Sequence, residues 1–189
     1  MKTLLSVVAA VIVVGVMIAF WAIGTRNHLI DLDEVANKGW RDISVQLERR
    51  ADLVPNLVAT VKGYAAHEKE IFTAVAEARS KLLAAKTPAE KAAADAAMTS
   101  ALGRLLAIGE NYPQLKADMV FIRLQDELAG TENRIAVART RYNDSVKAYN
   151  AAIRKFPGSL FAPGLDLSRR DYYEAPADKD VTTVPTVQF

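Results

Sequence analysis

The sequence predicts an all-α protein, in which an N-terminal transmembrane helix is followed by an antiparallel bundle of long helices with a kinked first helix. Three observations lead to this fold class. An uncharged stretch begins near the N-terminus, a helical apolar period starts at Leu29, and an apolar heptad pattern fills the C-terminal half. The chain of 189 residues is long enough to bury a core.

The uncharged stretch, LLSVVAAVIVVGVMIAFWAI, occupies residues 4–23. As a helix it would be about 30 Å long, the thickness of a bilayer hydrocarbon core. Trp21 lies near its end, where indole rings are found among lipid headgroups. The alternative is a cleaved signal peptide, but the stretch is longer than a usual signal core and no A-x-A site follows it. We therefore expect an uncleaved anchor that contacts the lipid bilayer through residues 4–23.

The charges that flank this stretch leave its orientation open. Lys2 is the only basic side chain before it, whereas Arg26, Lys38 and Arg41 follow it. This difference slightly favours a cytoplasmic position for the rest of the chain. Three acidic residues within positions 31–34 weaken that argument.

The first bundle helix is predicted to occupy residues 27–86 and to continue through Pro55. Its apolar residues recur every three or four positions, the period of one helix face. Proline removes one backbone hydrogen bond and crowds the carbonyl four residues earlier, here that of Ala51. Asp52 could instead cap a new helix after a tight hairpin. Because the apolar period keeps its phase and no glycine is present there, we predict a kink at Asp52 and Pro55.

Two further helices and a tail complete the prediction. The second helix, residues 88–108, starts with a capping box formed by Thr87 and Glu90. The third helix, residues 114–156, has an apolar seam with spacings of three and four, as packed antiparallel helices have. The chain is thus divided into an anchor (1–26), a helical bundle (27–156) and an extended, loosely held tail (157–189).

The composition offers little for catalysis or cofactor binding. There is no cysteine, and the 24 basic and 22 acidic residues nearly balance, so nothing suggests nucleic acid as a partner. His67 begins the sequence HEKEI, which lacks the second histidine of the zinc motif H-E-x-x-H. We therefore expect no catalytic residue, metal or cofactor. The alternative is a hydrolase or metal enzyme whose site is assembled only on folding.

Polar residues near the predicted kink and on the third helix form a candidate polar seam. Its members are Gln46, Arg49, Asp52, Asn56, Glu127 and Arg134, and Arg50 and Glu132 belong to the same polar groups. One interpretation is a solvated face, on which i, i+4 pairs contribute roughly 0.2–0.5 kcal/mol each. The other is that some of these charges meet between helices and fix their register.

Two segments carry a resemblance to a known family. VQLERRADLVPNLVATVKGYAAHEKEIFTAVAEARS, residues 45–80, resembles the signature segment of the LemA family. LQDELAGTENRIAVARTRYNDSVKAYN, residues 124–150, is similar to the family's last long helix, and FPGS follows as its stop. The resemblance covers about residues 27–161, whereas the tail only loosely resembles the glycine- and phenylalanine-rich ending common in the family.

This resemblance implies a bacterial protein with one N-terminal membrane span and an antiparallel helical bundle. The family has no established enzymatic activity, and a related protein belongs to magnetosome membranes. Together with the predicted fold, it suggests a membrane-anchored scaffold or interaction protein in the bacterial cytoplasmic (inner) membrane. Family descriptions place the bundle in the cytoplasm. The alternative is a regulatory partner of a membrane enzyme, bound to an unidentified membrane protein.

We also expect a homo-oligomer. The first helix is predicted to be longer than its partners, so an apolar stripe near the anchor would lack an intramolecular partner. That candidate interface consists of Leu29, Leu32, Trp40, Ile43 and Leu47. Such a stripe rarely stays exposed to water, and copies anchored in one membrane are concentrated for pairing. The alternative is a monomer whose own third helix and tail cover the stripe.

Overall fold

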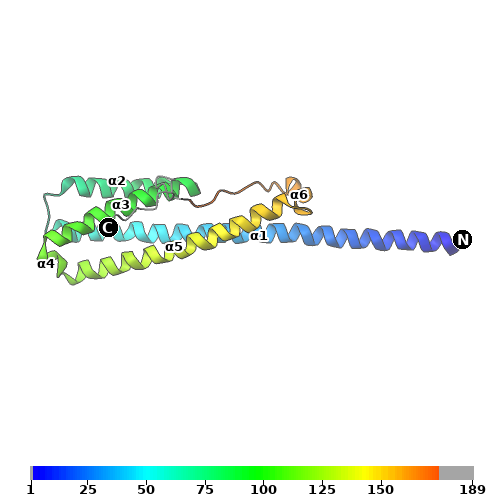
Figure 1. The fold of residues 1–189 in the computed structure, drawn as a ribbon, viewed down its shortest axis with the longest axis horizontal. Helices are drawn as coiled ribbons and strands as arrows, with labels where there is room; N and C mark the ends of the chain where they lie inside the picture. Colours follow the sequence, from blue (N-terminus) through cyan, green and yellow to red (C-terminus); the bar gives the residue numbers. More distant parts are fainter. Residues whose placement is uncertain (1, 175–189) are drawn as a thin grey trace, which may run out of the picture. The chain divides into compact units, whose positions relative to one another are not determined.

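The computed structural model describes residues 2–174, and every regular element within them is a helix. In chain order these are α1 (Lys2–Lys62), α2 (Lys69–Ala84), α3 (Pro88–Asn111), α4 (Pro113–Lys116), α5 (Met119–Arg154), α6 (Gly158–Phe161) and the 3₁₀ helix η1 (Pro163–Leu165) (Figure 1). The predicted all-α fold class is therefore confirmed.

The described residues form two compact units, and α1 and α5 each contribute to both. The first unit contains the described parts of Met1–Gly39 and Asn143–Arg170, and the second contains those of Trp40–Tyr142 and Asp171–Phe189. In the second unit, Gln46 bonds Arg134 and Arg49 bonds Glu127, so α1 and α5 run in opposite directions. α2 and α3 also pack against each other as an antiparallel pair (Figure 1). The bundle is antiparallel, as predicted.

α1 is one continuous helix of 61 residues that includes both the uncharged stretch and Pro55. It contains a window with a mean hydropathy of 2.8, none of it buried, which has the length and composition of a membrane span. Because the helix continues through Pro55, the hairpin alternative is wrong, while the bend itself stays a prediction. The helix ends at Lys62, so its predicted continuation to residue 86 is wrong.

The break after α1 lies in residues 63–68, a turn that begins with glycine. The Tyr64 amide bonds back only three residues, to the Val61 carbonyl at 3.0 Å, which tightens the last turn of the helix. Glycine is also a poor helix former. The apolar period hides this break because Val61 before it, Ala65 within it and Phe72 after it are all buried and keep the phase.

α3 begins as predicted. The Thr87 hydroxyl accepts a hydrogen bond from the Glu90 amide at 3.2 Å, and the Glu90 carboxylate accepts one from the Thr87 amide at 3.1 Å. The amide of Lys86 also donates to this carboxylate, and this bond is the main cause that lowers the pKa of Glu90. The helix ends at Asn111 rather than at residue 108.

The predicted third helix, residues 114–156, is divided into α4 and α5. Asp118 caps α5, because its Oδ1 accepts hydrogen bonds from the amides of Val120 and Phe121 at 2.7 and 3.3 Å. Its Oδ2 accepts a hydrogen bond from the Tyr64 hydroxyl at 2.8 Å, which is the main cause that lowers the pKa of Asp118. The hydrogen bond between Tyr64 and Asp118 therefore joins the break after α1 to the break between α4 and α5.

The segment after α5 differs from the extended, loosely held tail that was predicted. It begins with α6 and η1, and Ala162 between them joins a buried core of the first unit with Leu29, Tyr149 and Ile153. Residues beyond η1 have no helix up to Glu174, yet Tyr173 is fully buried. The tail is thus packed as far as Tyr173, and residues 175–189 lie outside the described residues.

The five residues of the candidate oligomer interface are covered by this chain itself. Ile43 and Leu47 are fully buried, Leu29 lies in the core of the first unit with Leu32 packed against it, and Trp40 is half-buried. The Trp40 ring lies 5.8 Å from that of Tyr142 of α5, measured between centroids. The premise of an unpartnered stripe is therefore wrong, because α5 and the tail segment supply the partners. Self-association stays a prediction that needs another surface.

Candidate functional site

A buried charged cluster of the second unit centres on Arg50 of α1. Arg50 follows the buried residues Ile43 and Leu47 at helical spacings, so the helix presents it on its buried face. Its Nη1 lies 2.8 Å from Asp95 Oδ1 of α3 and 2.7 Å from Glu132 Oε2 of α5. Asp95 is also buried, whereas the Glu132 side chain is half-exposed. One guanidinium nitrogen therefore joins three helices.

The tail closes this cluster through Tyr173. The Tyr173 hydroxyl donates a hydrogen bond to Asp95 Oδ2 at 3.3 Å. The guanidinium of Arg139 in α5 lies 5.2 Å from the centre of the tyrosine ring, within the range of a cation–π contact. Asp95 thus accepts from Arg50 with one oxygen and from Tyr173 with the other, so that the cluster ties α1, α3, α5 and the tail together.

Burial dominates the electrostatics of the cluster. It raises the pKa of Asp95, although the positive charge of Arg50 acts in the opposite direction. Burial also raises the pKa of Tyr173, and the nearby charge of Asp95 adds to that effect. Tyr173 therefore keeps its proton and remains a hydrogen-bond donor. The Nε of Arg50 is buried without a hydrogen-bond partner among the described residues, which costs free energy that the two ion pairs must offset.

A second arginine compensates for Pro55. Arg79 of α2 donates from its Nε to the main-chain carbonyl of Ala51 at 2.8 Å. Pro55 has no N–H, so this carbonyl lacks its normal partner within the helix. Arg79 Nη2 also lies 3.9 Å from Asp52 Oδ1. One side chain of α2 therefore contacts both Asp52 and the Ala51 carbonyl that Pro55 leaves without a donor.

Contacts between α1 and α5 involve four residues of the candidate polar seam. Arg49 Nη2 lies 3.1 Å from Glu127 Oε2, and Arg134 Nε donates to Gln46 Oε1 at 3.0 Å. All four side chains lie at the surface, and both hydrogen bonds are exposed to solvent. Asn56 contributes its main-chain carbonyl to a bond within α1. The seam thus connects two helices, and its effect on their register stays a prediction.

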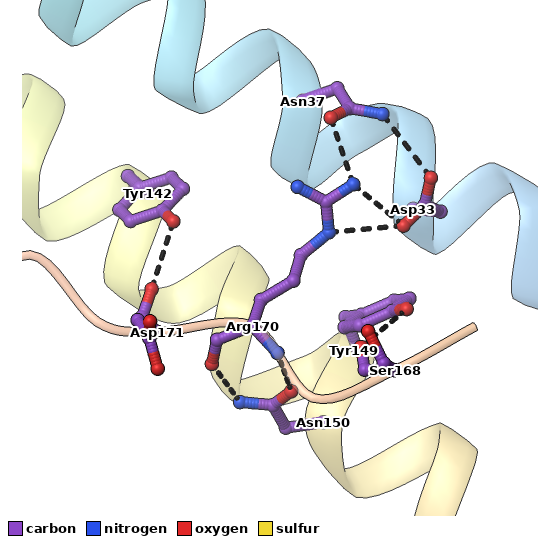
Figure 2. A network of polar contacts seen from close by, with 8 residues as sticks. All are labelled: Asp33, Asn37, Tyr142, Tyr149, Asn150, Ser168, Arg170 and Asp171. Atoms are coloured by element: carbon purple, nitrogen blue, oxygen red, sulfur yellow. Dashed lines mark hydrogen bonds and ion pairs between the residues drawn. The ribbon is translucent and has the colours of Figure 1, made fainter. Parts of the chain in front are cut away.

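In the first unit, Arg170 fixes the tail to α1 (Figure 2). Its Nε and Nη2 donate to Asp33 Oδ1 at 3.0 and 2.8 Å, and Nη2 also donates to Asn37 Oδ1 at 2.8 Å. Asn150 of α5 holds the main chain of the same residue: its Nδ2 donates to the Arg170 carbonyl and its Oδ1 accepts from the Arg170 amide, both at 2.9 Å. The Arg170 guanidinium also lies 5.4 Å from the centre of the Tyr149 ring.

Two tyrosines of α5 bind the tail through its main chain. Tyr149 donates to the Ser168 carbonyl and Tyr142 to the Asp171 carbonyl, both at 2.9 Å (Figure 2). Burial raises the pKa of Tyr149, and the negative charge of Asp33 adds to this, so the hydroxyl stays a donor. The heptad pattern predicts both tyrosines on the apolar seam, but it contains no signal for their main-chain partners.

The remaining candidates for chemistry are spread apart. Within residues 2–174 there is no group of three or more His, Cys, Asp or Glu side chains that could hold a metal ion. His67 lies in the turn between α1 and α2, where its carbonyl accepts a hydrogen bond from the Lys69 amide, and His28 is exposed on α1. The polar clusters described above bind helices and main chain to one another.

These features define a class: an all-α bundle that continues from a helix with the length and composition of a membrane span, closed by buried polar contacts. The sequence profile of the LemA family matches residues 39–189. The chain therefore belongs to the LemA family, as the resemblance implied.

Three relatives illustrate this membership. The chain is 28% identical over 188 residues to "Magnetosome protein MamQ" of Magnetospirillum gryphiswaldense, covering 85% of this chain and 69% of the relative. It is 27% identical over 174 residues to "Magnetosome protein MamQ 2" of Paramagnetospirillum magneticum, covering 78% and 64%. It is 27% identical over 161 residues to "Protein LemA" of Metamycoplasma hominis, covering 82% and 72%. With the apolar part of α1, these relatives indicate a membrane-associated protein.

Proposed function

We propose that this protein is a membrane-anchored helical scaffold, an interaction protein that performs no catalysis of its own. The observation that supports this best is the Arg50 cluster. Its buried charges, Arg50 and Asp95, bind each other, and Asp95 also accepts a hydrogen bond from Tyr173 of the tail. Charges used in this way stabilise one arrangement of helices and tail. Membership in the LemA family supports the same proposal.

The proposed anchor is the uncharged part of α1, residues 4–23, in the bacterial cytoplasmic membrane with the bundle on the cytoplasmic side. Because the anchor and the bundle belong to one chain, a partner bound to the bundle would be tethered to the membrane. Similarity to two proteins named for the magnetosome supports a role in organising a membrane. The chain has no cysteine, so Met119→Cys, at an exposed position, would report the side. An impermeant maleimide should label it only after the cells are permeabilised.

Photocrosslinking of the full chain in native membranes tests the scaffold role. A photoreactive residue at Val120 or Val137, both exposed on α5, should capture a reproducible partner that mass spectrometry can identify. The same probes in an Arg50→Met background are the matched control, because loss of the cluster should disrupt the bundle and abolish the crosslinks. Absence of any partner, together with a stoichiometric metal found by elemental analysis, would instead support the metal-enzyme alternative.

We further propose that copies of the chain associate in the membrane. Anchoring in one plane raises their effective concentration, which favours even weak contacts. The covered stripe no longer contributes to this argument, and polar substitution of the buried Ile43 would report folding rather than assembly. Native mass spectrometry of the full chain in mild detergent should give an oligomer, and a homogeneous monomer would contradict self-assembly.

A further inference from the structure

Two large apolar side chains are exposed in the first unit where α5 ends and α6 begins. Phe156 is 73% exposed and Leu160 of α6 is 65% exposed. Phe161, the last residue of α6, packs instead against the core of the unit. Single exposed apolar residues are common on proteins, whereas contiguous exposed apolar patches mark sites of contact with proteins or membranes.

The same segment contacts the apolar part of α1. The ring centroid of Trp21 lies 5.9 Å from that of Phe156 and 6.2 Å from that of Phe161, the latter in an edge-on arrangement. Trp21 lies near the end of the uncharged stretch and is itself exposed. Because Phe156 is in ring contact with Trp21, both lie at the same depth relative to any membrane that residues 4–23 cross.

The local backbone prevents this surface from turning inward. A Cβ on Gly158 would clash with the Ala152 carbonyl, so the glycine permits α6 to fold tightly back on the end of α5. Ala162, directly after α6, is buried in the core with Leu29 and Ile153. With one end of α6 fixed by this close approach and the other by the core, Leu160 points outward.

A cavity of about 500 Å³ adjoins these residues. Trp21, Leu29 and Phe156 give it a largely apolar lining, while Lys155 and His28 lie in the same lining as polar groups. This arrangement matches a phospholipid: an acyl chain suits the apolar cavity, and a negatively charged phosphate suits the exposed ammonium group beside it. Lysine side chains near a membrane surface commonly extend toward the headgroups.

We propose that residues 156–161 form a second membrane contact, which inserts Phe156 and Leu160 into the phospholipid interface beside the anchor. The occupant is the bilayer rather than another protein, because the surface continues directly from Trp21 at the end of the span. Tryptophan is enriched at the level of the lipid headgroups, and Phe and Leu are residues that interfacial helices insert beneath them. The inference rests on the proposed anchoring of residues 4–23 and goes beyond it, since it assigns lipid contact to the end of the bundle.

Depth measurements on the full chain test this contact. The protein, with single cysteines carrying an environment-sensitive fluorophore, is reconstituted in vesicles of equal parts phosphatidylcholine and phosphatidylglycerol. Ser159→Cys, at an exposed position, places the fluorophore in α6 while Phe156 and Leu160 are retained. Val35→Cys, at a site of α1 that is 54% exposed, is the matched aqueous control. Nitroxide-labelled lipids should quench the Ser159→Cys label severalfold more than the Val35→Cys label.

Two further samples make the outcomes distinct. A label at Val13→Cys reports the anchor, and if it is not quenched by the lipids, the proposed anchoring is itself wrong. If it is quenched while the Ser159→Cys label behaves like the aqueous control, only the second contact is wrong. Adding Phe156→Ser and Leu160→Ser to the Ser159→Cys chain should remove most of its lipid quenching at unchanged helix content. Quenching that persists would show that these two side chains do not insert.

Discussion

Arg49 and Arg50 are neighbours on α1, and each pairs with an acidic residue of α5, yet their surroundings differ. The Arg49 side chain is 56% exposed and pairs with the half-exposed Glu127. The Arg50 side chain is 6% exposed and shares one nitrogen between Asp95 and Glu132. Successive residues of an α-helix point about 100° apart. That rotation carries one arginine to the solvent and the other into the core.

The difference predicts which polar contact contributes more to the stability of the bundle. An exposed pair contributes about 0–1 kcal/mol, because water competes for both charges. A buried charge that loses its partner gains little from water in exchange, so burial of the Asp95 carboxylate without Arg50 costs much more free energy. We therefore expect that loss of Arg50 destabilises the bundle more than loss of Arg49.

The largest expected effect is therefore that of Arg50→Met. This change should lower the free energy of unfolding by about 3–5 kcal/mol at neutral pH, because Asp95 keeps a buried carboxylate without its cation. Chemical unfolding of the full chain in detergent, followed by circular dichroism, measures it. Arg49→Met is the matched control on the adjacent residue. Equal losses for the two variants would show that burial does not distinguish the two arginines.

Asp95→Asn should cost less, about 2 kcal/mol, because the amide can still accept a hydrogen bond from Arg50. It should also change the pH dependence. Since burial raises the pKa of Asp95, the folded state binds more protons than the unfolded state from about pH 4, the ordinary aspartate pKa, up to the raised value. Across that window this residue makes the native protein less stable as pH rises.

The measurement is the free energy of unfolding as a function of pH for the native protein and for Asp95→Asn. Glu90 and Asp118, whose pKa values are lowered, contribute with the opposite sign in both proteins, so the difference isolates residue 95. The fall in stability with rising pH should be absent from Asp95→Asn. Parallel curves would mean that Asp95 is not desolvated.

Arg79→Ala should cost about 1–2 kcal/mol, because the Ala51 carbonyl loses its donor. In a Pro55→Ala chain the same change should cost much less, since the N–H of alanine can bond this carbonyl within the helix. The four unfolding free energies of this double-mutant cycle give the coupling directly. Independent, additive effects would show that Arg79 does not compensate for the proline.

Arg49→Ala should have the smallest effect, less than about 1 kcal/mol. Salt should reduce it further, because ions screen exposed charges. Thermal unfolding at low and high ionic strength provides the test, with Glu127→Ala as the partner control. A loss as large as that of Arg50→Met would place Arg49 among the residues that determine the bundle.

The sequence predicts elements well where a local signal marks them. The Thr87 and Glu90 capping box fixes the start of α3, and the unbroken apolar phase predicts that α1 continues through Pro55. The helix breaks at residues 63–68 and at Asp118 are not predicted. The apolar period keeps its phase across the first break, and the only local mark of the second is a single capping aspartate. Their mutual hydrogen bond links positions far apart in the chain, which no local pattern contains.

The candidate site is predicted less well, since its members come from four separate segments. Arg50 and Glu132 belong to polar groups that the sequence shows, but their burial depends on packing. The burial of Asp95 could have been predicted from the sequence. Asp95 lies on the same helix face as Met98, Leu102 and Leu105, at spacings of three and four, so an acidic residue interrupts an apolar stripe. No sequence pattern predicts the role of Tyr173, because its contact with Asp95 depends on the path of the tail.

The way in which α5 holds the tail has a consequence for how this protein can change over time. Tyr149 and Tyr142 bind the carbonyls of Ser168 and Asp171, and Asn150 binds the peptide groups of Arg170. Every residue has the same peptide group, so these hydrogen bonds do not depend on which side chains occupy positions 168 and 171. Substitutions can accumulate at these two positions without detaching the tail from α5. A tail whose sequence departs from the family's usual ending can therefore still be attached by the same three side chains.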